Sequence, residues 1–158
     1  MVHALTEAAR VAQTTVLDIR PLIEPPEIWV RDQAGADTRC GGLQRKPDAP
    51  PSHISAANAM AQVVAEGLFA IEKVERFEWI DVYESLDELI EAVAEEWENW
   101  LIEEDVSLKL VREMERAGRG AQPFIRQGIQ AQVLKKIAVS ALITQAILSI
   151  YCAARLLL

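Results

Sequence analysis

The sequence predicts an α/β fold, or an α+β fold if only a few strands form the sheet. Two observations favour this. A short apolar strand follows a helical segment at the start of the chain, and two long alternating segments are separated by stretches of helical periodicity. The chain has 158 residues, 51% hydrophobic and 25% charged, which is typical of a folded domain and unlike a disordered chain.

The N-terminal third predicts a helix, a strand and an irregular region. Apolar residues recur at helical spacing over residues 2–12. Thr14–Arg20 is short, β-branched and mostly apolar, which is typical of a buried strand. Proline and glycine interrupt the following stretch, Pro21–Pro51. Within it, we expect Glu27–Arg31 and Leu43–Arg45 to pair as a small hairpin.

The middle of the chain predicts a helix and then a long extended segment. Ser52 or Ser55 can cap the helix, and Gly67 stands where a residue with positive φ commonly ends one. Phe69–Tyr83 then reads as a strand. One side of its alternation carries three aromatic residues, namely Phe77, Trp79 and Tyr83.

Two further helices and a last strand follow. Ser85 and Glu88 form a capping box, in which each side chain accepts a hydrogen bond from the other residue's main-chain N–H. The helix that it opens is expected to carry one apolar stripe, made of Leu86, Leu89, Ile90, Val93, Trp97, Trp100 and Leu101. Val106–Ala117 predicts another helix, and Phe124–Val139 predicts a strand in which Gly128 indicates a bulge or bend.

Charge is concentrated in one stretch. Asp81–Asp105 holds 11 carboxylates and no Lys or Arg, within a chain of net charge −8. Such a surface repels phosphate backbones, so we expect no nucleic-acid partner. The basic cluster of Arg39, Arg45 and Lys46 is too small to change this expectation.

The cysteines and the two ends of the chain indicate a compartment. Cys40 and Cys152 lack metal-site spacing, and the first seven residues have neither a basic nor an apolar leader segment, which favours a reducing, cytoplasmic setting. Ile137–Ala154 contains 18 residues without a charge. We expect residues 138–158 to form an apolar helix or tail that packs on protein, with a membrane anchor as the alternative.

Two segments near the N-terminus resemble a known enzyme family. His3–Val11, followed by Val16–Pro21, is similar to the fourth helix and fifth strand of class I S-adenosylmethionine-dependent methyltransferases. The resemblance implies a partial Rossmann-like sheet, with one buried strand and two antiparallel strands flanked by helices. The resemblance also implies that residues 1–137 form a truncated methyltransferase-like domain.

The resemblance also implies a strand order. In the complete family the last strand inserts between the fifth and sixth strands. We therefore expect Phe124–Val133 to lie between Val16–Ile19 and Phe69–Val82.

The sequence departs from the family where the cofactor binds. The family needs a glycine-rich turn after its first strand and an acid after its second, and no strand followed by G-x-G occurs here. Gly41 and Gly42 lie in a loop after the resembling strand. We therefore expect no S-adenosylmethionine binding or methyl transfer by this chain alone, and we assign no cofactor, catalytic residue or metal ligand.

A sheet without its first half would expose an unpaired strand edge. This predicts a homo-oligomer or a partner chain that adds a strand. Three functions remain open: a methyltransferase-like fragment, a module that completes or regulates another chain, and a membrane-tethered adaptor that uses residues 137–154.

Three residues are candidates for a vestigial ligand pocket. Asp18 and Arg20 end the predicted buried strand, where α/β folds place ligand contacts. A structural ion pair is the alternative for these two residues. Trp29 is a candidate for a substrate-side contact, with packing of the hairpin as the alternative.

Other polar and aromatic residues have simpler interpretations. His3 and His53 are isolated, which favours surface positions. Three acids, Glu91, Glu95 and Glu98, lie one turn apart and are interpreted as a solvated face rather than a cation site. Trp97 and Trp100 are expected in a core or an interface.

Overall fold

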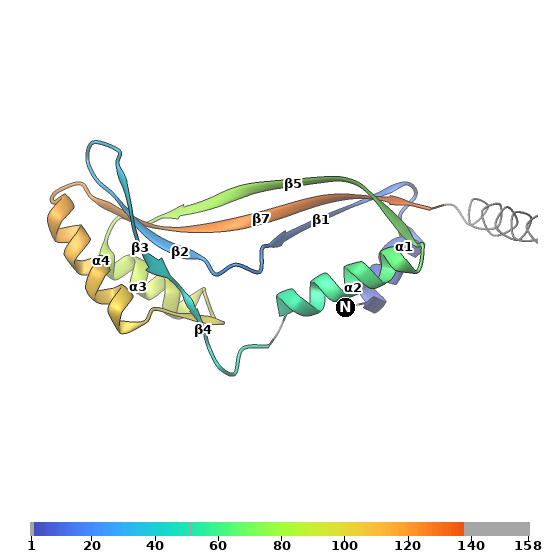
Figure 1. Ribbon diagram of the computed structural model, residues 1–158, viewed down its shortest axis with the longest axis horizontal. Coiled ribbons are helices and arrows are strands. Elements are labelled where there is room, and N and C mark those ends of the chain that lie inside the picture. Colours follow the sequence, from blue (N-terminus) through green and yellow to red (C-terminus); the bar gives the residue numbers. More distant parts are fainter. Residues whose placement is uncertain (1, 51, 138–158) are drawn as a thin grey trace, which may run out of the picture. The chain divides into compact units, whose positions relative to one another are not determined.

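The computed structural model describes residues 2–50 and 52–137 (Figure 1). In this part of the chain it is a mixed α/β structure with a mostly antiparallel open sheet. The elements in chain order are α1 (Val2–Val11), β1 (Thr15–Pro21), β2 (Glu27–Arg31), β3 (Asp37–Gly42), β4 (Gln44–Arg45), α2 (Ser52–Ala65), β5 (Phe69–Val82), α3 (Leu86–Glu95), β6 (Trp100–Leu101), α4 (Glu104–Ala117) and β7 (Gln122–Lys136).

Some predictions lie beyond this range. The apolar helix or tail predicted at residues 138–158, all of the alternative anchor 137–154 except residue 137, and the thiol of Cys152 fall outside the described residues. Among the helices of the described ranges, none combines the length and the apolar character that crossing a bilayer requires.

Strand β7 lies at the centre of the sheet. β1 and β2 pair with β7, β3 pairs with β2, and β5 also pairs with β7 (Figure 1). Main-chain hydrogen bonds near the ends of these pairings run from Leu22 N–H to Gly128 O, Lys136 N–H to Thr14 O, Tyr83 N–H to Pro123 O and Ile137 N–H to Leu68 O. β1 and β5 are therefore both antiparallel to β7 and parallel to each other. The predicted insertion of the last strand between these two is confirmed.

The chain forms two compact units. The first contains, among described residues, 2–19, 54–75 and 131–137. Its core combines residues of α1, α2, β5 and β7, namely Ala9, Met60, Val63, Phe69 and Leu134. Gly67 ends α2 with φ +73°, and the N–H groups of Gly67 and Leu68 donate to the carbonyls of Val64 and Val63. The predicted glycine stop is thus confirmed.

The prediction that β1 is buried is wrong. Val16 packs with the first unit's core, but Leu17 and Ile19 are 60% and 58% exposed. Alternate side chains of a strand point to opposite faces, so the residues next to Val16 face away from this core. An apolar run does not by itself show that both faces of a strand are covered.

The second unit contains residues 20–50, 52–53 and 76–130 within the described ranges. Its core joins the sheet to α3 and α4 through Ile28, Val30, Cys40, Leu89, Val93, Leu110 and Ile125. α4 approaches β3 so closely that a Cβ on Gly41 would lie 2.5 Å from Cγ2 of Val106. Glycine is therefore needed there for helix and strand to pack.

The predicted hairpin has a different second strand. β2 pairs with β3, whereas β4, within the predicted partner Leu43–Arg45, pairs with β6. The turn explains this. The Asp32 side chain accepts hydrogen bonds from the N–H groups of Ala34 and Ala36, and Gly35 has φ +84°, so the chain reverses immediately after β2.

The capping box is present with one change, and α3 is shorter than predicted. Ser85 accepts a hydrogen bond from the Glu88 N–H, but the Glu88 carboxylate accepts from the N–H of Glu84 instead of Ser85. α3 ends at Glu95, so three members of the predicted stripe, Trp97, Trp100 and Leu101, lie outside the helix. Pairing of β6 with β4 accounts for the extended Trp100–Leu101 segment.

Candidate functional site

Alternation along β2 separates two sets of side chains in the second unit. Ile28 and Val30 point into the core. Glu27, Trp29 and Arg31 lie on the opposite face, because successive residues of a strand alternate between faces. The register with β7 places Trp29 opposite Phe124 and Glu27 opposite Arg126, so these residues share one face.

Aromatic rings and guanidinium groups stack on this face. The rings of Trp29 and Phe124 are stacked, with centroids 6.3 Å apart and planes inclined by 16°. The Arg126 guanidinium carbon lies 4.3 Å from the Trp29 ring centroid, and that of Arg31 lies 5.0 Å from the Phe124 centroid. These distances are typical of cation–π contacts.

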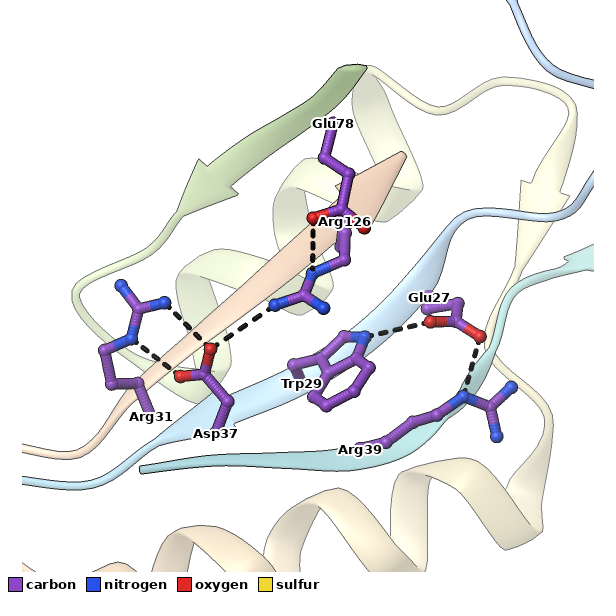
Figure 2. Close-up of polar contacts among 7 residues, drawn as sticks. All are labelled: Glu27, Trp29, Arg31, Asp37, Arg39, Glu78 and Arg126. Carbon is purple, nitrogen blue, oxygen red and sulfur yellow. Dashed lines mark hydrogen bonds and ion pairs between the residues drawn. The ribbon is translucent and has the colours of Figure 1, made fainter. Parts of the chain in front are cut away.

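Asp37 links the two arginines (Figure 2). Its carboxylate accepts from Nε and Nη2 of Arg31 at 2.7 and 3.0 Å and from Nη2 of Arg126 at 3.3 Å. The hydrogen bond from Arg31 lowers the pKa of Asp37 below its usual value, and the same contact raises the pKa of Arg31. Asp37 therefore stays ionised and holds both guanidinium groups beside the rings.

Two further carboxylates complete the network. Glu27 accepts from the indole N–H of Trp29 at 3.1 Å and from Nε of Arg39 at 2.7 Å. Glu78 lies 3.7 Å from Nε of Arg126, which is buried and makes no hydrogen bond within the described chain (Figure 2). We call this network the arginine–aromatic cluster; its members are Glu27, Trp29, Arg31, Asp37, Arg39, Glu78, Phe124 and Arg126.

The chemistry of the cluster favours binding or support over catalysis. Three arginines face three carboxylates, so its formal charges balance. It contains no hydroxyl or thiol nucleophile and no histidine that could activate one. Arg126 covers one face of the Trp29 ring, and Glu27 holds the indole N–H. The cluster therefore fixes the orientation of Trp29.

The three predicted pocket residues lie on two strands. Asp18 and Arg20 are half-buried in β1, in the first and second unit respectively. Trp29 is half-buried in β2 and belongs to the arginine–aromatic cluster.

The other predicted residues lie as follows. His3 is exposed on α1, and the side chain of His53 is outside the described atoms. The three acids Glu91, Glu95 and Glu98 are exposed, and within residues 2–50 and 52–137 no group of acids, His or Cys has the arrangement of a metal site. Trp100 is buried in the core and Trp97 packs against it, which confirms their predicted core positions.

The basic residues Arg39, Arg45 and Lys46 do not form a common patch of free cations. Arg39 pairs with Glu27, Arg45 donates to the carbonyl of Pro50, and Lys46 donates to the carbonyl of Glu98 at 2.8 Å. The thiol of Cys40 is buried. Burial raises its pKa to about 11, so the thiol stays protonated near neutral pH and is a poor nucleophile.

Sequence reasoning found Trp29 but missed its partners. Arg31, Asp37, Phe124 and Arg126 join it only through the β2–β3 and β2–β7 registers. The available signal was the alternation Glu27-Ile28-Trp29-Val30-Arg31, which puts two charges and an aromatic ring on one face.

Comparisons of the chain with protein-family models, with curated proteins and with solved structures give no match in any of the three.

We predict that Asp37→Asn changes how stability depends on pH. The pKa of Asp37 is lowered by folding, so its contribution is present above the usual carboxyl value of 3.8 and is lost as the pH falls through the folded-state pKa. Urea denaturation should show that the variant is less stable than wild type at pH 7 and that the difference shrinks below about pH 4.

Glu24→Gln is the matched control, because it neutralises an exposed loop carboxylate. It should follow the wild-type pH profile. A difference between Asp37→Asn and wild type that stays constant from pH 7 to below the usual carboxyl range would contradict the assignment.

Proposed function

We propose that this chain is a methyltransferase-like C-terminal half that does not bind S-adenosylmethionine alone and that completes its sheet with a strand from a second chain. The proposal depends on one observation above all. β7 runs antiparallel between two parallel strands, β1 and β5, in the order that the resemblance implies.

The way the second unit is connected supports the same proposal. The last residues of β1, Arg20 and Pro21, and the last part of β5, residues 76–82, belong to the second unit. Parallel strands of α/β sheets carry their ligand sites beyond their carboxyl ends. The carboxyl-terminal residues of β1 and β5 thus belong to the second unit, and we assign this unit to acceptor-side binding.

The glycine pattern supports the absence of cofactor binding. The G-x-G sequence in the chain, Gly118-Arg119-Gly120, follows the helix α4 and precedes the strand β7. A dinucleotide-type turn needs the reverse order, strand first and helix second, so that the helix N-terminus meets the ligand.

The edge of β1 supports strand addition. β1 is the terminal strand of the described sheet, with β7 as its neighbour. Thr14 and Leu22 bond to β7, so by alternation the N–H groups of the odd-numbered residues Leu17 and Ile19 point away from it. Both side chains are more than half exposed. A partner strand would therefore find main-chain donors and apolar surface together.

The first experiment titrates S-adenosylmethionine into the full chain in a calorimeter. We expect no binding, because no glycine-rich turn in the sequence stands between a strand and a following helix, as the cofactor site requires. Stoichiometric binding by this chain without a partner would refute the proposal.

The second experiment measures association by light scattering. We predict that the full chain self-associates when no other strand is present, and that Leu17→Lys with Ile19→Lys shifts it to the monomer, because burial of each side chain contributes about 1 kcal/mol and a charge at a strand edge prevents pairing. Circular dichroism should be unchanged.

Leu108→Lys, which places the same charge on an exposed apolar position of α4, is the control and should still associate. A wild-type chain that remains monomeric across its soluble range, or a double variant that associates as wild type does, would contradict pairing through β1.

A further inference from the structure

A second feature of the second unit lies outside the arginine–aromatic cluster. A cavity of about 460 Å³ is lined by residues of the β5 end, the turn after α3, β6 and β7. Its volume lies within the range of small-molecule sites. Three tryptophans, Trp79, Trp97 and Trp100, contribute to its wall.

The charge of the lining is negative. Glu96 and Glu98 both line the cavity, and none of its lining residues is a lysine or arginine. Lys46 reaches the main-chain carbonyl of Glu98 at 2.8 Å, but it lines a different cavity. An anionic ligand is therefore disfavoured in this cavity, and a cation is attracted to it.

A polar side chain also lines the cavity. Gln127 is only 6% exposed. Its amide is not among the fully buried side-chain atoms of the described residues that lack a hydrogen-bond partner, so the amide does not require a ligand. Because an amide carries both donors and an acceptor, it can bond a polar group of a molecule in the cavity.

One wall of the cavity is held in place in advance. Trp97 packs against the second unit's core, which includes Tyr83, and the Tyr83 hydroxyl donates to Asp81 at 3.0 Å. Burial raises the pKa of Tyr83, so the hydroxyl keeps its proton and this hydrogen bond persists at neutral pH. A ring that is already oriented loses little entropy when a ligand binds.

We propose that this cavity binds an alkylated ammonium group, with the tryptophan rings contacting its methyl groups, the two glutamates supplying the opposite charge and Gln127 bonding a polar atom next to the charged centre. Aromatic faces combined with nearby carboxylates are the surroundings that attract quaternary ammonium ions. This inference does not depend on the proposed methyltransferase origin.

The test compares choline with 3,3-dimethyl-1-butanol, its uncharged isostere, by tryptophan fluorescence and calorimetry on the full chain. We expect saturable binding of choline and at least tenfold weaker binding of the isostere, because only choline carries the charge. A trimethyllysine peptide, compared with its unmethylated form, distinguishes a protein side chain from a free amine as the source of the group.

Two variants with matched controls locate the site. Trp79→Leu should weaken choline binding about tenfold, whereas Phe77→Leu, on the same strand but outside the cavity lining, should not. Both side chains are about half exposed, so neither change should unfold the chain. Glu98→Gln should weaken binding several-fold, and Glu91→Gln, an exposed acid of α3, should leave it unchanged.

Three results would overturn the proposal. The first is that neither choline nor the methylated peptide binds saturably at millimolar concentration. The second is that the uncharged isostere binds as tightly as choline. The third is that Trp79→Leu and Glu98→Gln both bind as wild type does.

Discussion

The pairing of β7 on both of its edges is the constraint on which the rest of the structure depends. The main-chain groups of two even-numbered residues, Gly128 and Lys136, form hydrogen bonds with residues next to the ends of β1. Those of two odd-numbered residues, Pro123 and Ile137, form hydrogen bonds with residues next to the ends of β5; Ile137 itself lies just past the end of β7. Gly128 accepts from Leu22 where β1 has ended, and a Cβ there would lie 2.7 Å from the Leu22 side chain. Residues 23–26 then loop out before β2 continues along β7.

β7 also separates the two functional features of the second unit. Phe124 and Arg126 lie on one face of the strand with the arginine–aromatic cluster, and Gln127 belongs to the alternate set and lines the cavity. The cluster is charge-balanced and most of its polar atoms are paired. The cavity is acidic, and none of its lining residues is a lysine or arginine. This contrast is why we assign support to the cluster and ligand binding to the cavity.

Local signals in the sequence predicted the features that depend on neighbouring residues. The Ser85 cap, the Gly67 stop and the extended β5 and β7 are of this kind. The resemblance added the order of β1, β7 and β5. The predicted helical stripe from Leu86 to Leu101 was wrong beyond Glu95. Its apolar residues keep helical spacing there, but Trp100 and Leu101 form the strand β6 and pair with β4. The exposure of Leu17 could not be foreseen, since it depends on which elements cover β1.

The candidate sites were harder to predict for the same reason. Trp29 could be singled out as an aromatic residue in a loop-rich segment, but Asp37 and Arg126 reach it only across two strand registers. Trp79, Trp97 and Gln127 come from three separate elements, and no spacing in the sequence connects them.

Residue-resolved amide hydrogen exchange on the full chain tests the central claim most directly. If β7 is inserted between β1 and β5, consecutive amides from residue 129 to residue 136 must all be protected, because even-numbered residues donate to one neighbour and odd-numbered residues to the other. Protection of every second amide alone would show that β7 is paired on one edge, and would contradict the insertion on which the proposed function depends.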